Sequence, residues 1–227
     1  MSNPRLLSAL AVGLSALMLS GCAGSASPGL GVTVGDETIS ASRIDAAAKN
    51  VCIAFSDQLK PGEVLPLGLI KQVVVDLFAL TAQAEQIAEE YAISPSATHQ
   101  REVAGHTRAA SLMPEEVRAD YIEYVSAVAL RNDVAEQVGR AKLTAEGFAE
   151  PTIEQAGQAG SDVFATWPNA NAIEVNPKYG VELVNGRFVP VDTSLSFAVS
   201  DDAKAGMATE IDPTYASSLP SSQRCGG

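Results

Sequence analysis

Few side chains in this sequence carry reactive or metal-binding groups, and their spacing limits what they can do. The two histidines, His99 and His106, lie seven residues apart in a segment with helical periodicity. Seven residues span about 10.5 Å along a helix, whereas a zinc–nitrogen bond is about 2 Å long. One metal ion cannot bind both without further ligands, so we expect two surface histidines, no metal site and no cofactor.

Cys22 follows a segment with the layout of an export signal. Arg5 precedes an apolar run of 14 residues, Leu6 to Leu19, which is short for a bilayer span of about 20. A membrane helix or a buried core helix is the alternative. The stretch Leu19-Ser20-Gly21-Cys22 also resembles the lipobox of bacterial lipoproteins. That resemblance implies removal of residues 1–21, lipidation of Cys22 by acyl chains such as palmitate, and anchoring at the extracytoplasmic face of the cell membrane.

Cys52 and Cys225 are the two remaining cysteines. An exported compartment is oxidising, which favours a disulfide between them. In the chain-entropy model, closing so long a loop stabilises a fold by roughly 5 kcal/mol. Two unrelated thiols remain the alternative. A bond would join the C-terminal tail to the first predicted helix.

Other polar patterns have simple structural explanations. The adjacent acids Glu115-Glu116 and Asp201-Asp202 point apart on a helix, so capping and solvation account for them. No Gly-x-Ser-x-Gly sequence is present, and we assign no catalytic residue.

Trp167, the only tryptophan, is predicted to be a core or interface anchor. A binding groove formed by Trp167 with Tyr121, Tyr124 and Met113 is the sharper alternative.

The composition excludes several partner classes. A formal charge of −12 argues against nucleic acid and against electrostatic adhesion to anionic lipid. Aromatic residues make up 5% of the chain, too few for base-stacking platforms.

Apolar periodicity and turn residues predict a mainly helical chain with strands near both ends. A strand-turn-strand is expected over Val32 to Ile39, and strand-like segments follow after residue 172. Pairing of the strands at the two ends would close the fold. The expected helices are a first one from Ser40 or Ser42 to Pro61, then Leu67–Tyr91, Ser96–Ala110, Pro114–Leu143 and a weaker one from Pro151 to Trp167. The expected later strands are 173–176, 181–189 with a turn at Asn185-Gly186, and 194–199.

Three patterns resemble the N-terminal, substrate-binding domain of SurA-like extracytoplasmic chaperones. Val32 to Ser40 is similar to the family's small strand-turn-strand, which leads into the first helix. The long helix ending in Ala92-Ile93-Ser94 is similar to the family's Leu-rich helix before Gly-Ile-Ser, with Ala92 in place of the glycine. Val175-Asn176-Pro177-Lys178-Tyr179-Gly180 is similar to a segment of Gram-positive lipoproteins that carry such a domain.

The resemblance implies an α+β, mainly α-helical fold: a SurA N-terminal-like helical domain with a small β element formed by the N-terminal hairpin and C-terminal strands. The predicted organisation is a signal peptide (1–21), a flexible lipidated tether (22–31), and the helical domain with a β-rich extension (32–227). The nine tether residues that follow Cys22, 23–31, reach about 30 Å at most, which keeps the domain near the membrane.

The implied function is chaperone-like binding of unfolded or newly exported polypeptides without ATP. A structural or interaction lipoprotein with one cell-envelope partner is the alternative. A residual peptidyl-prolyl isomerase comes third, because the chain contains no recognisable parvulin module and is not expected to be an enzyme.

Overall fold

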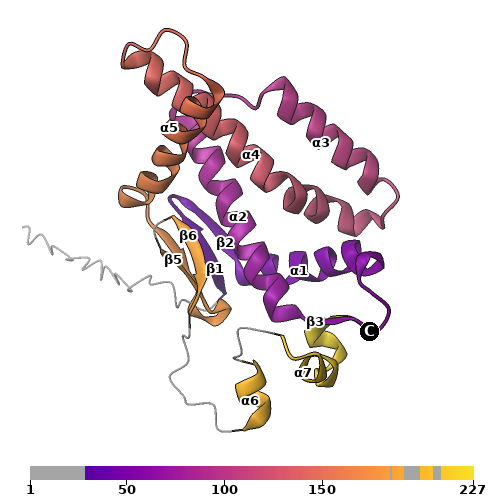
Figure 1. Ribbon diagram of the computed structural model, residues 1–227. Coiled ribbons are helices and arrows are strands. Elements are labelled where there is room, and N and C mark those ends of the chain that lie inside the picture. Colours follow the sequence, from indigo (N-terminus) through magenta and orange to yellow (C-terminus); the bar gives the residue numbers. More distant parts are fainter. Residues whose placement is uncertain (1–28, 185, 192–199, 207–210) are drawn as a thin grey trace, which may run out of the picture.

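The computed structural model describes residues 29–184, 186–191, 200–206 and 211–227, and it is mainly helical with small antiparallel sheets (Figure 1). The α+β, mainly helical class is therefore correct. The helices are α1 (Ala41–Phe55), α2 (Leu67–Glu90), α3 (Ala97–Ala110), α4 (Glu115–Ala145), α5 (Ile153–Thr166), α6 (Asp201–Gly206) and α7 (Pro213–Ser218). The strands are β1 (Leu30–Val34), β2 (Glu37–Ser40), β3 (Val64–Pro66), β4 (Ile173–Val175), β5 (Val181–Val184), β6 (Arg187–Pro190) and β7 (Arg224–Gly226). Single turns of 3₁₀-helix occupy Ser56–Gln58, Trp167–Asn169, Pro177–Tyr179 and Ser221–Gln223.

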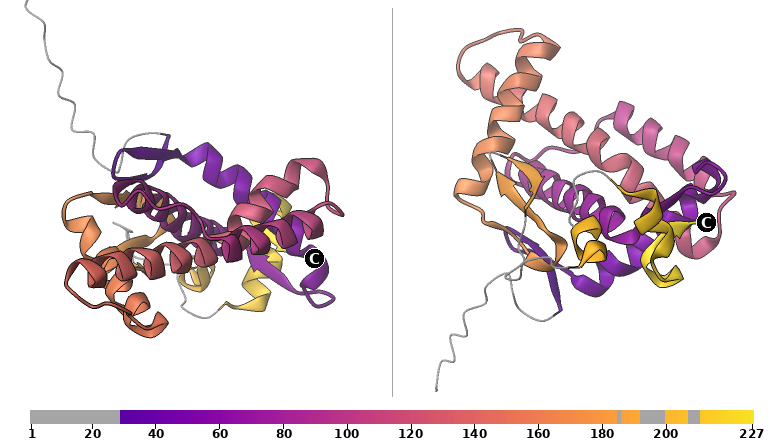
Figure 2. Two further views of the ribbon diagram at one scale, coloured as in Figure 1. Left: turned by 90° about the horizontal axis from the view of Figure 1, so that it is seen from above. Right: turned by 60° about the horizontal axis from the view of Figure 1, so that its bottom comes forward.

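The long helix α2 runs through the middle of the molecule, between α1, α4 and the β1–β2 hairpin (Figure 1); Figure 2 shows this arrangement from two further directions. By length and composition α2 is the one described helix apolar enough to cross a membrane. The side chains on the inner face of α2 form the centre of the hydrophobic core, and this burial accounts for the apolar composition of the helix. The side chains of α2 that are almost fully enclosed are Val74, Val75, Phe78, Ala79, Ala84 and Ile87.

The buried face of α2 differs from the expected stripe. The helical spacing of the apolar residues in Leu67–Tyr91 would place Val73 and Tyr91 on the inner face together with Val74 and Ile87. In the structure Val73 and Tyr91 are exposed, and Phe78 is buried instead. In α4, apolar spacing would likewise place Val128 on the inner face, but the Val128 side chain is exposed and the Asp120 side chain is buried. Helices α2 and α4 each contact several neighbouring elements. The positions of these neighbours, rather than one regular stripe of apolar residues, therefore determine which side chains are buried.

Ala92 ends α2 in the left-handed conformation, with φ of 53°. The Ile93 N–H donates to the Ala88 carbonyl at 2.8 Å, and the Ala92 N–H donates to the Glu89 carbonyl at 3.0 Å. These two bonds are the Schellman pattern that glycine usually completes. The helix therefore stops where the sequence predicted, although alanine replaces the expected glycine.

Helices α4 and α5 cross with their backbones in contact. A Cβ added to Gly139 would lie 1.8 Å from the Ala156 carbonyl oxygen, and one added to Gly160 would lie 1.7 Å from the Ala135 carbonyl oxygen. Both positions exclude any side chain. Helix α3 packs on the outside of α4 (Figure 1).

Three sheets close the fold. The order β2-β1-β4 makes β1 the central strand, and β4 pairs antiparallel with it, so the expected pairing of N-terminal and later strands is correct. The expected hairpin around Gly186 is present as β5 and β6. Strands β3 and β7 and helices α6 and α7 were not predicted. The expected strand 194–199 and the signal and tether up to residue 28 lie outside the described residues.

Candidate functional site

The candidate site is a groove of about 550 Å³ between the β1–β2 hairpin and helices α1, α2 and α4. Because it follows the strand at one edge of the three-stranded sheet, we call it the edge groove. All four residues of β2 line it. Its lining residues are Glu37, Thr38, Ile39, Ser40, Arg43, Phe78, Thr81, Ala82, Glu85 and Glu123.

Arg43 is held in one position at the α1 side of the edge groove. Its Nη1 lies 2.5 Å from Asp120 Oδ1 and its Nη2 lies 2.7 Å from Glu123 Oε2, so the guanidinium links α1 to α4. The Arg43 Cζ also lies 4.7 Å from the centre of the Phe78 ring, within range of a cation–π interaction. Asn50 donates to the second oxygen of the buried Asp120 at 2.6 Å. Arg43, the one cation among the described residues that line the groove, is therefore already paired with two carboxylates.

Ser40 connects this cation to the hairpin. Its Oγ accepts a hydrogen bond from the Arg43 N–H at 3.1 Å and so caps the N-terminus of α1. The sequence predicted a cap at Ser40 or Ser42, and the structure selects Ser40. Strand β2 thus passes directly into the helix that carries Arg43.

The carboxyls of the edge groove are in an unfavourable environment for negative charge. Burial raises the pKa of Glu85, and the neighbouring Glu37 raises it further. Burial is also the largest cause of the raised pKa of Glu123, where the lowering effect of Arg43 is opposed by Asp120 and Glu85. No ion pair within the described residues involves Glu37 or Glu85. The groove has an excess of negative charge that a bound cation would relieve.

Among the strands that the structure describes, none pairs with the outer side of β2. The sheet order places β2 at the edge, and the register pairs Val34 with Glu37 and Thr33 with Thr38 across a two-residue turn. Gly35, first in that turn, has φ of 56°, as such a hairpin requires. Hydrogen-bonded and non-hydrogen-bonded pairs alternate in an antiparallel ladder, so the N–H and C=O of Thr38 point away from β1. These groups face the unpaired edge.

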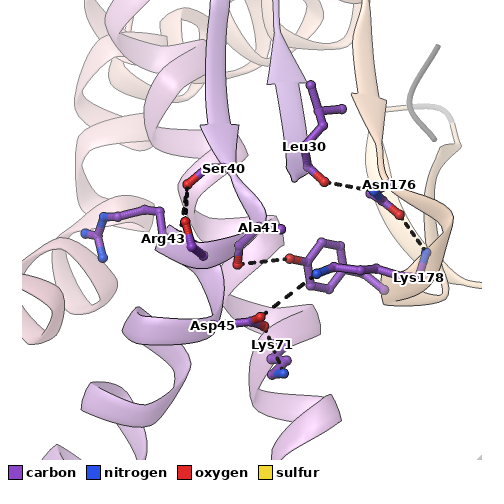
Figure 3. Close-up of polar contacts among 10 residues, drawn as sticks. Leu30, Ser40, Ala41, Arg43, Asp45, Lys71, Asn176 and Lys178 are labelled. Atoms are coloured by element: carbon purple, nitrogen blue, oxygen red, sulfur yellow. Dashed lines mark hydrogen bonds and ion pairs between the residues drawn. The ribbon is translucent and has the colours of Figure 1, made fainter. Parts of the chain in front are cut away.

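The segment Val175–Gly180, which we call the closure motif, lies outside the edge groove and joins distant parts of the chain (Figure 3). Asn176 Nδ2 donates to the Leu30 carbonyl and the Asn176 N–H donates to the Gly31 carbonyl, both at 2.8 Å. The Lys178 N–H donates to Asn176 Oδ1 at 3.1 Å. The motif that carried the most specific resemblance thus fixes the first strand in place.

Tyr179 supplies the buried part of the closure motif. Its hydroxyl donates to the Ala41 carbonyl at 3.5 Å, and its own carbonyl accepts from Gln72 Nε2 at 3.0 Å. Burial raises the pKa of Tyr179 to about 12, with a further contribution from the carboxylate of Asp45. Asp45 lies between the ammonium groups of Lys71 and Lys178, at 2.8 and 4.0 Å (Figure 3).

Cys52 and Cys225 form a disulfide, with Cα atoms 5.6 Å apart. The pairing predicted from the sequence is therefore present. Strand β7, which contains Cys225, also pairs with β3, so covalent and hydrogen bonds attach the C-terminal tail beside α1. Cys22, the predicted lipidation site, lies outside the described residues.

The two histidines do not form a site. His99 is 8% exposed between α3 and α4, so the expectation that it lies on the surface is wrong; the reason is that α3 turns this face toward α4. His106 is half-buried and lies 3.8 Å from Glu102. Among the described residues, no group of three or more His, Cys, Asp or Glu side chains can hold a metal ion.

The aromatic groove considered from the sequence is not formed. Trp167 is 7% exposed within the core, where its ring lies beside Gly35, in agreement with its expected role as an anchor. Tyr121 and Tyr124 pack instead on Phe55, with ring centres 5.7 and 5.5 Å apart. The acid pairs lie in the first turns of their helices, Glu115-Glu116 in α4 and Asp201-Asp202 in α6, where negative charge is favourable to the helix dipole. The expected capping is wrong: Pro114 precedes α4 without a side-chain cap, and at the start of α6 the Ser200 Oγ accepts from the Ala203 N–H at 3.1 Å.

The sequence did not reveal the edge groove, because its lining comes from four separate elements. One usable signal was Asp120, which lies three positions after Val117 and so on the same face of the predicted helix, where a charged residue needs a partner when it is buried. Arg43, the partner, is 77 positions away, and no spacing rule connects them.

Comparisons of the chain with protein-family models, with curated proteins and with solved structures found no match.

Proposed function

We propose that this chain is a lipid-anchored extracytoplasmic protein that binds unfolded or newly exported polypeptides without ATP, through a domain related to the N-terminal domain of SurA-like chaperones. The observation that carries the proposal is the edge groove beside the unpaired edge of β2. A groove that offers backbone hydrogen-bonding groups suits ligands defined by their extended backbone. Lipidation of Cys22 and the short tether would hold this domain at the extracytoplasmic face of the cell membrane.

The element order supports the proposed relationship. A hairpin leads into α1, a long helix crosses the core, and the closure motif returns to the hairpin. We propose no enzymatic activity: among the described residues that line the edge groove, no serine or threonine hydroxyl is bonded to a carboxylate or a histidine.

An aggregation assay tests the proposed function. The mature protein, at several-fold molar excess and without ATP, is expected to suppress light scattering by a chemically unfolded model client. No suppression at that excess contradicts the proposal. Membrane fractionation of Cys22→Ser tests the anchor, and an equally firm association with membranes would show that Cys22 does not hold the protein there.

A lipoprotein with one defined cell-envelope partner is the second candidate. The exposed large apolar side chains of the described residues favour it, because they are scattered over several elements and do not line the edge groove: Ile53, Leu69, Val73, Tyr91, Leu112, Val128, Phe148, Ile153, Val184 and Ile211. General binding of unfolded chains usually uses a larger apolar patch. Crosslinking in intact cells separates the candidates, since one saturable product indicates a single partner and many products indicate general binding.

A further inference from the structure

The edge of β2 has the geometry of a strand-addition site. The Thr38 N–H and C=O face away from β1, and no other described group is bonded to them. Soluble proteins usually protect such edges with a bulge, a proline or a covering element. Here the bulge lies on β1 at Leu30 to Val32, so it leaves the outer edge of β2 regular.

The space beside this edge is large enough for an extended peptide. Its volume of about 550 Å³ lies in the range of ligand-binding pockets, roughly 300 to 1,000 Å³. An added strand would lie about 4.8 Å from β2, and four of its residues would span about 13 Å, the length of β2 itself. Phe78 and Ala82 line the groove on the α2 side but are almost fully enclosed by the core, so the partly exposed Ile39 of β2 is its more accessible apolar residue.

The charges of the groove select the side chain of the incoming segment. Glu37 and Ile39 share a face of β2, and Glu37 lies near enough to Glu85 on α2 to affect its ionisation. Arg43 does not compensate these two carboxylates, because Asp120 and Glu123 already occupy its guanidinium. A lysine or arginine is therefore the complementary group.

Thr81 provides a second, independent indication of a ligand. Its Oγ1 is buried at the groove and has no hydrogen-bond partner among the described residues. A buried hydroxyl without a partner costs free energy, which a donor or acceptor of a bound segment would recover.

We propose that the edge groove binds an extended polypeptide segment carrying a lysine or arginine, which adds to the sheet as a strand alongside β2. This inference rests on the proposed polypeptide-binding function and specifies its ligand. Backbone hydrogen bonds from Thr38 position the segment, and Glu37 and Glu85 bind its cation.

Peptide binding to two Thr38 variants of the mature chain tests the proposal. The probe is a short labelled peptide of alternating Val and Thr around a central lysine, and the readout is fluorescence anisotropy. Thr38→Pro removes the outward N–H, which an edge strand tolerates, and Thr38→Val keeps it. Loss of one hydrogen bond and obstruction of the edge are expected to weaken binding about tenfold in Thr38→Pro. Thr38→Val is expected to bind within about twofold of wild type.

Changes to the peptide give a test that does not depend on folding of a variant. N-methylation of alternate amides removes strand hydrogen bonds and is expected to abolish binding to the wild-type protein. Glutamate in place of the central lysine is expected to do the same. Full binding of the N-methylated peptide, or equal binding by Thr38→Pro and wild type, overturns the proposal.

The aggregation assay separates this inference from the proposed function. If wild type and Thr38→Pro suppress aggregation equally, β2 is not the site, although polypeptide binding stands. If the peptide binds at Thr38 but no client is protected, the strand-addition site stands and the general chaperone-like function fails. If wild type neither binds the peptide nor protects a client, both proposals fail.

Discussion

The closure motif and the edge groove use similar polar residues for opposite purposes. In the closure motif, Asn176 bonds to both Leu30 and Lys178, and Lys178 shares the neighbouring Asp45 of α1 with Lys71. In the edge groove, four kinds of group have no such partner among the described residues: the outward N–H and C=O of Thr38, the carboxylates of Glu37 and Glu85, and the hydroxyl of Thr81. Complete pairing stabilises a fold, whereas unpaired groups in a groove are available to a ligand. The most distinctive sequence motif is therefore structural, and the candidate site has no motif.

The largest expected effect is that of Tyr179→Ala in the closure motif. Removing a buried aromatic ring is expected to reduce the free energy of unfolding by about 3 to 5 kcal/mol. Chemical denaturation monitored by circular dichroism measures it. Peptide binding by the fraction that remains folded should be unchanged, and a specific loss of affinity at full folding would contradict the division between the two regions.

Asn176→Ala is expected to reduce the free energy of unfolding by about 1 to 3 kcal/mol, because the Leu30 carbonyl loses its donor. Asn176→Asp is the matched variant, since it keeps the acceptor for Lys178 but places a carboxylate against the Leu30 carbonyl. The Asp variant is expected to be at least as destabilised in the same denaturation experiment. Wild-type stability of both variants would show that the Asn176 side chain does not hold β1.

Ala92→Gly is a stability change outside both regions. Alanine at φ of 53° costs about 1 kcal/mol relative to glycine, so the glycine variant is expected to be about 1 kcal/mol more stable. Thermal unfolding provides the measurement. Unchanged peptide affinity in this variant would show that affinity does not simply follow stability.

The pH dependence of peptide binding tests the carboxylates of the edge groove. Because the pKa values of Glu85 and Glu123 are raised, these groups take up protons at a higher pH than ordinary glutamates do, and a bound cation favours their ionised forms. Affinity for the lysine peptide should therefore decrease severalfold as the pH falls from about 7 to about 5. Anisotropy titrations of Glu85→Gln should show weaker binding with a shallower pH dependence, and an unchanged profile would remove Glu85 from the site.

Tyr179→Phe is expected to have the smallest effect. The hydroxyl makes one long hydrogen bond, so the loss near pH 7 should be below about 1 kcal/mol. The unfolded phenol ionises near pH 10, whereas the folded one has a pKa of about 12. The folded state thus retains a proton that the unfolded state has lost, and the wild-type protein loses stability between these values. Denaturation at rising pH should show a steeper loss for wild type than for the Phe variant.

Local patterns were sufficient to predict most of the elements. Alternating Val and Ile around Gly35 predicted the β1–β2 hairpin, and Ser40 and Ser96, where the sequence predicted helices to begin, cap α1 and α3. The sequence did not predict α6 and α7, because short helices near residue 200 lack a sustained apolar period. It also misplaced Val73 and His99, since burial on a helix depends on which neighbours pack against it.

The sequence by itself determined the helical period, the turns, the caps and the presence of two cysteines able to pair, all of which depend on neighbouring residues or on composition. Only the tertiary structure decided that Asn176 holds Leu30, that Arg43 bonds to Asp120, and that β2 is the edge strand beside Glu85. These relations join residues far apart in the chain. Packing brings them together, and no rule of local spacing contains that information.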